Sequence, residues 1–158
     1  MQFKKAMKIA EEEFMYHLHG QVLVKLPGFK IVKQAWDKRE EFHSSGELME
    51  LTQFAPWKEF VFEIEAEQEC QGKLKFAINK DGRGLWKVMA VPPKPNTFDI
   101  RVPLHDDWRG LRNKELQEKS GVSDAEFVHR AGFIGGAWSK ESAIKMAEIS
   151  IKAFNEAK

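Results

Sequence analysis

Apolar residues recur along the first twenty positions at the spacing of an amphipathic helix. Phe3, Met7, Ala10, Phe14 and Leu18 follow one another at intervals of three or four residues. This periodicity predicts a helix from about residue 2 to the low twenties with one apolar face. We expect that face to pack against the interior of the domain.

The rest of the chain alternates between helical and strand patterns. Helical spacing predicts further helices at 31–39, in a short segment after Pro56, at 111–120 and at 139–157. Alternation of apolar and polar residues predicts a short strand within 47–54, a β-hairpin over 73–90 with a DGRG turn, and a last strand at 126–130. We therefore predict an α+β fold, one domain over residues 1–158, with a mixed or antiparallel sheet flanked by helices.

The amino-acid composition limits the kinds of molecule that the chain can bind and the compartment that it fits. The 25 basic and 24 acidic residues nearly cancel, so nucleic acid could be held only by a local patch and not by bulk charge. Cys70 is the single cysteine of the sequence, which excludes an internal disulfide framework and fits a reducing compartment. The sequence has no apolar run of membrane-spanning length. We expect an intracellular, soluble protein without a membrane partner.

The segment 127–141, FVHRAGFIGGAWSKE, combines a glycine-rich stretch with the start of the last predicted helix. Gly132, Gly135 and Gly136 allow positive φ angles and a close approach of the backbone to a ligand. Ser139 is a natural N-cap, and a helix start offers unpaired N–H groups to an anion. Further positive charge comes from His129, Arg130 and Lys140. The pattern indicates a phosphate site, although the same residues are also typical of an ordinary end of a strand.

The segment 96–112, NTFDIRVPLHDDWRGLR, places Arg101, Arg109 and Arg112 around the aromatic residues Phe98 and Trp108. Guanidinium groups bind phosphates bidentately and aromatic rings stack on bases, as in grooves for single-stranded nucleic acid. The alternative is that Trp108 is a core residue and that Arg109 pairs with a neighbouring aspartate. We expect these arginines to converge with the glycine-rich segment on one anionic site.

The segments FDIRVPLHDDWRGLRNKEL, FVHRAGFIGG and WKVMAVPP, with KAMKIAEEEF and SGELMELTQFAPWKE, span nearly the whole chain. With RVPL, WRGLR, FVH and GFIGG following one another in that order, they resemble the C-terminal half of the Myg exonuclease family (melanocyte proliferating gene family), a branch of the DHH phosphoesterase superfamily. The resemblance implies that an N-terminal domain binds divalent metal, commonly manganese, and cleaves RNA from its 3′ end. It also implies that the C-terminal domain presents the substrate through its glycine-rich loop.

The resemblance assigns substrate or phosphate binding to matching positions of this chain, namely Arg101, Trp108, Arg109, Gly110, Arg112, His129, Gly132, Phe133, Gly135 and Gly136. Ala137 stands where relatives usually carry a polar residue, so a side-chain donor is missing there. No Asp-His-His run is present and the five histidines are scattered. We therefore expect no cofactor in this chain, with Mn or Mg implied for the family's catalytic half, and no catalytic activity of the chain alone.

Three functions follow as hypotheses. The leading one is a module that binds the phosphates of RNA, of another single-stranded nucleic acid or of a nucleotide, as the substrate-binding half of a DHH-type 3′-5′ RNA exonuclease. The alternative is a protein-interaction domain that assembles with a separate DHH-type catalytic domain. The third is a stand-alone hydrolase, for which the HSSG turn at 43–46 offers a histidine and serines without an evident acid partner.

Overall fold

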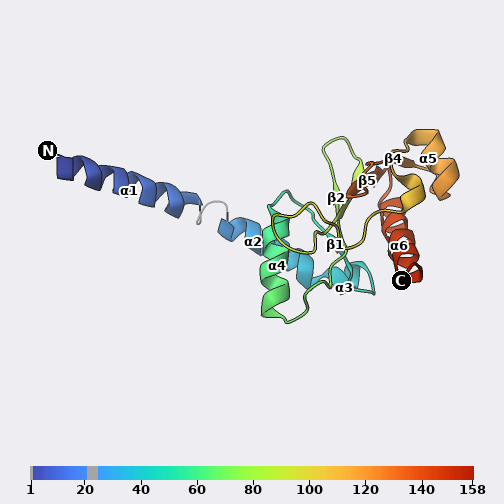
Figure 1. Cartoon of the computed structure of the whole chain (residues 1–158), viewed down its shortest axis with the longest axis horizontal. Coiled ribbons are helices and arrows are strands. Elements are labelled where there is room, and N and C mark those ends of the chain that lie inside the picture. The colour runs from blue at the N-terminus through green and yellow to red at the C-terminus, as the bar shows by residue number, and fades with distance from the viewer. Residues whose placement is uncertain (1, 21–24) are drawn as a thin grey trace.

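A five-stranded mixed sheet forms the centre of the fold, in a computed structural model that describes residues 2–20 and 25–158 (Figure 1). Its strands are β1 (Leu48–Glu50), β2 (Phe76–Lys80), β3 (Trp86–Ala90), β4 (Ala125–Val128) and β5 (Ile134–Ala137). Their order is β1-β2-β3-β5-β4, with β1 parallel to β2 and every other pair antiparallel. The predicted α+β class with a mixed sheet is confirmed.

Helices cover both faces of this sheet. On one face α2 (Leu26–Asp37) and α4 (Trp57–Glu67) pack with each other and enclose a core that includes Trp36, Met49, Ile64, Ala77 and Val91. On the other face α6 (Lys140–Glu156) packs on β2, β3 and β5 over a core that includes Phe76, Ile78, Val88, Leu104 and Met146. Figure 1 shows α4 and α6 on opposite sides of the strands.

The remaining described elements are short. Helix α3 (Arg39–Phe42) follows α2, and the 3₁₀ helix η2 (Asp106–Trp108) and helix α5 (Asn113–Ser120) precede β4. Gly121 ends α5 in the left-handed conformation, with φ of 68°, as helix C-termini favour. Ser139 caps α6 by accepting a hydrogen bond from the Ser142 N–H at 3.2 Å. These two predicted helix ends, the helix after Pro56 and the β2–β3 hairpin are confirmed.

The glycine-rich segment folds differently from the prediction. The turn occupies residues 129–133, and β5 lies between it and α6. Gly135 and Gly136 sit within β5, which is hydrogen-bonded on both edges, by β3 and by β4. Gly132 alone of the three predicted glycines has a positive φ, of 73°. The expectation of one continuous turn that feeds the helix is therefore wrong, because a strand lies between the two. A Cβ on Gly135 would lie 2.9 Å from the Phe127 carbonyl oxygen and one on Gly136 3.2 Å from the Trp86 carbonyl oxygen, so both glycines pack closely against neighbouring strands.

The first helix forms, but its apolar face does not pack as predicted. α1 (Gln2–Gly20) has every residue from 5 to 20 exposed, including Met7 at 59% and Phe14 at 65%. Figure 1 shows α1 extending away from the rest of the molecule. The side chain of Phe3 and the helix end expected in the low twenties lie outside the described residues. Periodicity predicts a helix with an apolar face, and it does not say which surface covers that face.

Candidate functional site

Two segments that are distant in sequence meet beside β4. The Gly110 N–H donates to the Val128 carbonyl at 2.9 Å, and the Val128 N–H donates to the Leu111 carbonyl at 3.1 Å. Arg112 then forms an isolated antiparallel bridge with Phe127. The WRGLR segment at 108–112 therefore runs along the outer edge of β4, opposite the edge that pairs with β5.

The β4–β5 turn brings its glycine against an arginine of that segment. A Cβ on Gly132 would lie 2.8 Å from Nε of Arg109 and 3.2 Å from Cβ of Pro103. A side chain larger than hydrogen would therefore displace the arginine. Together with the positive φ, this contact explains why glycine occupies position 132. The expected proximity of Arg109 to the glycine-rich segment is observed at Gly132.

The same turn presents a histidine and a phenylalanine to solvent. The rings of His129 and Phe133 are 4.6 Å apart, and Phe133 is 42% exposed. Nδ1 of His129 accepts a hydrogen bond from the Ala131 N–H at 3.1 Å. Since Nδ1 is the acceptor, the proton of the neutral ring is on Nε2, which is left as the donor toward solvent.

Three arginines lie on the two segments that meet here. The Arg109 guanidinium pairs with Asp106, and its Nε donates to the Leu104 carbonyl at 3.2 Å. Arg112 lies 5.7 Å from the centre of the Phe127 ring, and Arg130 is exposed. Across residues 2–20 and 25–158, neither Arg112 nor Arg130 has a carboxylate partner. We call the group the hairpin cluster, composed of Arg109, Arg112, His129, Arg130 and Phe133.

Arg101 and Trp108 have structural positions instead. The Arg101 side chain is 7% exposed, and its two terminal nitrogens each lie 2.7 Å from an oxygen of the Glu65 carboxylate. Trp108 is 2% exposed and belongs to the core on the α6 side. A buried, bidentately paired guanidinium and a buried indole are not available to a ligand. The assignment of these two residues to a phosphate site is corrected accordingly, and the core alternative for Trp108 is confirmed.

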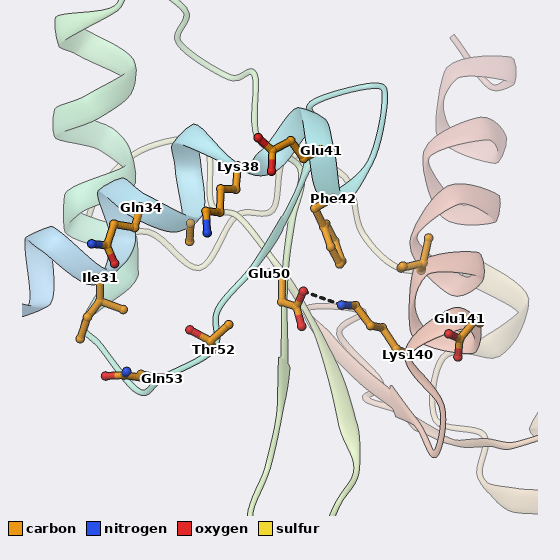
Figure 2. Close-up of a pocket in the computed structure, with 12 residues that line it drawn as sticks. Ile31, Gln34, Lys38, Glu41, Phe42, Glu50, Thr52, Gln53, Lys140 and Glu141 are labelled. Carbon is orange, nitrogen blue, oxygen red and sulfur yellow. Dashed lines mark hydrogen bonds and ion pairs between the residues drawn. The ribbon is translucent and has the colours of Figure 1, made fainter.

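Ser139 and Lys140 follow the other end of β5, and Lys140 lines an open pocket of about 510 Å³ (Figure 2). Lys140 Nζ is 2.5 Å from a carboxylate oxygen of Glu50 and 5.0 Å from the centre of the Phe42 ring. The charged residues that line this pocket are Lys38, Lys140, Glu41, Glu50 and Glu141. Two cations against three carboxylates do not favour a polyanion. Since β5 lies between the β4–β5 turn and Ser139, the structure does not bring Ser139 and Lys140 together with the hairpin cluster.

The HSSG turn has the acid partner that the sequence did not reveal. His43 Nε2 is 2.8 Å from Oε1 of Glu148 in α6, and His43 Nδ1 is 2.8 Å from the Ser45 hydroxyl. That hydroxyl also accepts the Glu47 N–H at 3.0 Å. Nδ1 is the ring nitrogen nearer the backbone, and the serine is held in a local turn. The contact between His43 and Glu148 joins the loop to α6. These contacts do not by themselves make the Ser45 hydroxyl a nucleophile that a substrate could reach.

Neither a metal centre nor a membrane span is found in the described part of the chain. Within it, no group of three or more His, Cys, Asp or Glu side chains is arranged to hold a metal ion. None of the described helices combines the length and apolar character needed to cross a bilayer. The manganese or magnesium implied for another part of the family stays a prediction.

Comparisons with known proteins assign a family. The family MYG1_exonuc, described as "Uncharacterised protein family (UPF0160)", matches residues 1–151. The "MYG1 protein" of Dictyostelium discoideum is 39% identical over 155 residues, which are 98% of this chain and 46% of that relative. The "MYG1 exonuclease" of Mus musculus is 39% identical, and that of Homo sapiens 37%, each over 150 residues that are 94% of this chain and 40% of the relative.

The length of the match limits what the relatives' names say about this chain. The chain spans less than half the length of these curated relatives. No solved structure matches it significantly. The family match covers nearly all residues that form the sheet, the hairpin cluster and the helices around them. On these grounds the chain belongs to the MYG1_exonuc family.

Proposed function

We propose that this chain is a nucleic-acid-binding module that holds the phosphates of single-stranded RNA at the hairpin cluster. In this proposal it is the substrate-binding part of a DHH-type 3′-5′ exonuclease, and catalysis with Mn or Mg belongs to the portion of the family outside the match. The observation that carries the proposal is the meeting of the WRGLR segment with the β4–β5 turn, which puts an exposed aromatic pair and two arginines without a carboxylate partner among the described residues on adjoining segments.

Each member of the hairpin cluster has a chemical role in such binding. Arg112 and Arg130 would supply the charge-assisted hydrogen bonds that phosphates accept. Phe133 is the exposed ring on which a base could stack, and His129 offers its Nε2–H beside it. Arg109 contributes less charge because Asp106 neutralises it. In a chain of formal net charge +1, such a local cluster is the way to attract a polyanion.

The relatives' names support the nucleic-acid class. Mouse and human relatives are named exonucleases, and an exonuclease must hold a polynucleotide chain end while it is cleaved. The preference for RNA over DNA or a mononucleotide is part of the proposal and rests on the resemblance of the motifs. The mixed charge of the pocket at Lys140 favours the hairpin cluster over that pocket as the place of contact.

The test is binding of a short fluorescent single-stranded RNA, measured by anisotropy over a range of salt concentrations. The double substitution Arg112→Ala and Arg130→Ala should weaken binding about tenfold or more and reduce the salt slope by roughly 2, about 1 for each phosphate that is no longer neutralised. The matched control is Arg83→Ala, an exposed arginine in the β2–β3 turn, near the opposite end of β5.

The control should change affinity by less than about twofold, since it removes one positive charge away from the cluster. Equal losses of RNA affinity in the double variant and in the control would mean that the RNA responds to positive charge anywhere on the surface and not to the hairpin cluster. Unchanged RNA affinity of the double variant would show that the hairpin cluster does not bind the RNA. Single-stranded DNA and a mononucleotide, titrated in parallel, decide the class of ligand.

A further inference from the structure

The apolar stripe of α1 has no partner within the described part of the chain. Met7 is 59% exposed, Phe14 is 65% and Leu18 is 41%. With Ala10 they fall within an arc of roughly 80° around the helix at 100° per residue. Most of the stability of a helix in a protein comes from packing of its apolar face, and α1, with 19 residues, has no such packing within the described chain. A surface that covers this stripe would therefore stabilise α1.

The stripe is part of the family's fold and not an appended tail. The family match begins at residue 1 and includes all of α1. The relatives that share this segment are more than twice as long as the matched region, which makes up 40–46% of their length. More than half of their length therefore has no counterpart in this chain and is available to cover the helix.

A second copy of α1 fits the stripe less well. Two-stranded coiled coils need apolar residues that alternate at three and four positions over several heptads. Here the intervals from Phe3 through Met7 and Ala10 to Phe14 are four, three and four, but the next position of this pattern is His17. The apolar heptad pattern therefore covers less than two heptads, fewer than the three or four that a coiled coil needs.

A membrane surface fits the stripe less well for electrostatic reasons. Helices that lie in the bilayer interface usually carry Lys and Arg on their polar face. The three glutamates of α1 at 11–13 balance its three lysines at 4, 5 and 8, which leaves no net positive charge to attract anionic lipids.

We propose that the α1 stripe is an interdomain docking surface for the portion of the MYG1 fold that lies outside the match, with an apolar protein face as its occupant. The inference does not depend on the nucleic-acid site, which is formed by other elements. It assigns α1 the role of an arm that joins the substrate-binding module to the remaining part of the family's fold.

The test titrates the labelled chain with the part of mouse MYG1 exonuclease outside the match, after that part has shown a cooperative melt. Phe14→Glu, within the stripe, should weaken binding about tenfold or more. The matched control is Ile9→Glu, which places the same charge on an exposed apolar residue roughly 200° from Met7 on the helix. This control should change the affinity by less than about twofold.

A second arm uses the complete mouse protein, so that the result does not depend on folding of the isolated part. Glutamate at the position aligned with Phe14 should lower its melting temperature by several degrees, and glutamate at the position aligned with Ile9 should not. Equal effects of the two substitutions in both arms would overturn the proposal. It would also be overturned if wild-type chain formed dimers by light scattering, or bound phosphatidylserine vesicles, in a manner that Phe14→Glu abolished.

Discussion

Glu65 and Arg101 form a buried ion pair that joins α4 to the segment preceding η2. Glu65 is 1% exposed and accepts, besides the guanidinium, the backbone N–H groups of Gly72 at 3.2 Å and Leu74 at 3.0 Å. Arg101 also donates to the Leu74 carbonyl at 2.9 Å. Burial lowers the pKa of neighbouring Lys75. The positive charge of Arg101 lowers this pKa further, whereas the negative charge of Glu47 raises it. This network organises the fold at a place where the sequence suggested a ligand.

Removing one partner of this pair should be costly. Glu65→Gln leaves the Arg101 charge buried without its counter-ion, so we expect a loss of about 3–5 kcal/mol in the free energy of unfolding. Urea denaturation measures it. Replacing both partners, by Glu65→Leu with Arg101→Met, should restore part of the loss, whereas an additive double variant would contradict the pairing.

Because of Asp81, the stability that the β2–β3 turn contributes depends on pH. Desolvation opposes ionisation, but hydrogen bonds from the backbone and side chain of Arg83 and from the Leu85 N–H outweigh it and lower the pKa of Asp81 to about 2. Because the folded pKa lies below the unfolded one, the stabilisation is complete above roughly pH 4 and is lost as pH falls through about 2.

The corresponding variant is Asp81→Asn, which does not ionise. We expect urea midpoints of the wild-type chain to fall more steeply than those of the variant between pH 4 and pH 2. At pH 7 the variant should be the less stable of the two. Parallel midpoint curves across this range would show that the Asp81 carboxylate does not contribute in the way that its hydrogen bonds indicate.

Among the strands, β5 depends most on its glycines. A Cβ on Gly135 would lie 2.8 Å from Cδ1 of Leu104 and 2.9 Å from the Phe127 carbonyl oxygen, closer than real Cβ contacts. Gly135→Ala should therefore lower the free energy of unfolding by about 1–3 kcal/mol. Gly82→Ala is the control, since a Cβ there meets nothing within 4 Å. An unchanged free energy of unfolding in Gly135→Ala would contradict the position of β5 in the sheet.

Most helices and the β2–β3 hairpin could be predicted from the sequence because their signals are local. The apolar periodicity of α6, its Ser139 cap and the DGRG turn each act within a few residues. Strand β5 was missed because its sequence, IGGA, has glycine where strands usually carry β-branched or aromatic residues. Its place in the sheet comes from pairing with β3 and β4, which local propensity does not contain.

The candidate site was predictable only in part. The motifs pointed to two segments that do meet, and Arg109 lies against Gly132 although 23 positions separate them in the chain. The partners that decide which arginines remain available are distant in sequence: Arg101 and Glu65 are 36 residues apart. The pairing of Lys140 with Glu50 spans 90 residues. Ion pairs of this kind follow from the tertiary fold and leave no local pattern.

The molecule as a whole has two features that its nearly neutral composition conceals. A basic and aromatic cluster lies at the β4–β5 turn, and an uncovered apolar helix extends from the body (Figure 1). The two belong to different elements, since α1 contributes nothing to the hairpin cluster. The first is the surface that we propose for binding a polynucleotide, and the second is the surface that we propose for docking the rest of the family's fold.

The most direct test of the nucleic-acid proposal is an NMR titration of the chain with a short single-stranded RNA, followed through the backbone amides. The account predicts that the largest shift changes fall on residues 109–112 and 129–133, the two segments that meet at the hairpin cluster. They should weaken as salt rises. Changes centred on the pocket around Lys140, or an unchanged spectrum at saturating RNA, would contradict the account.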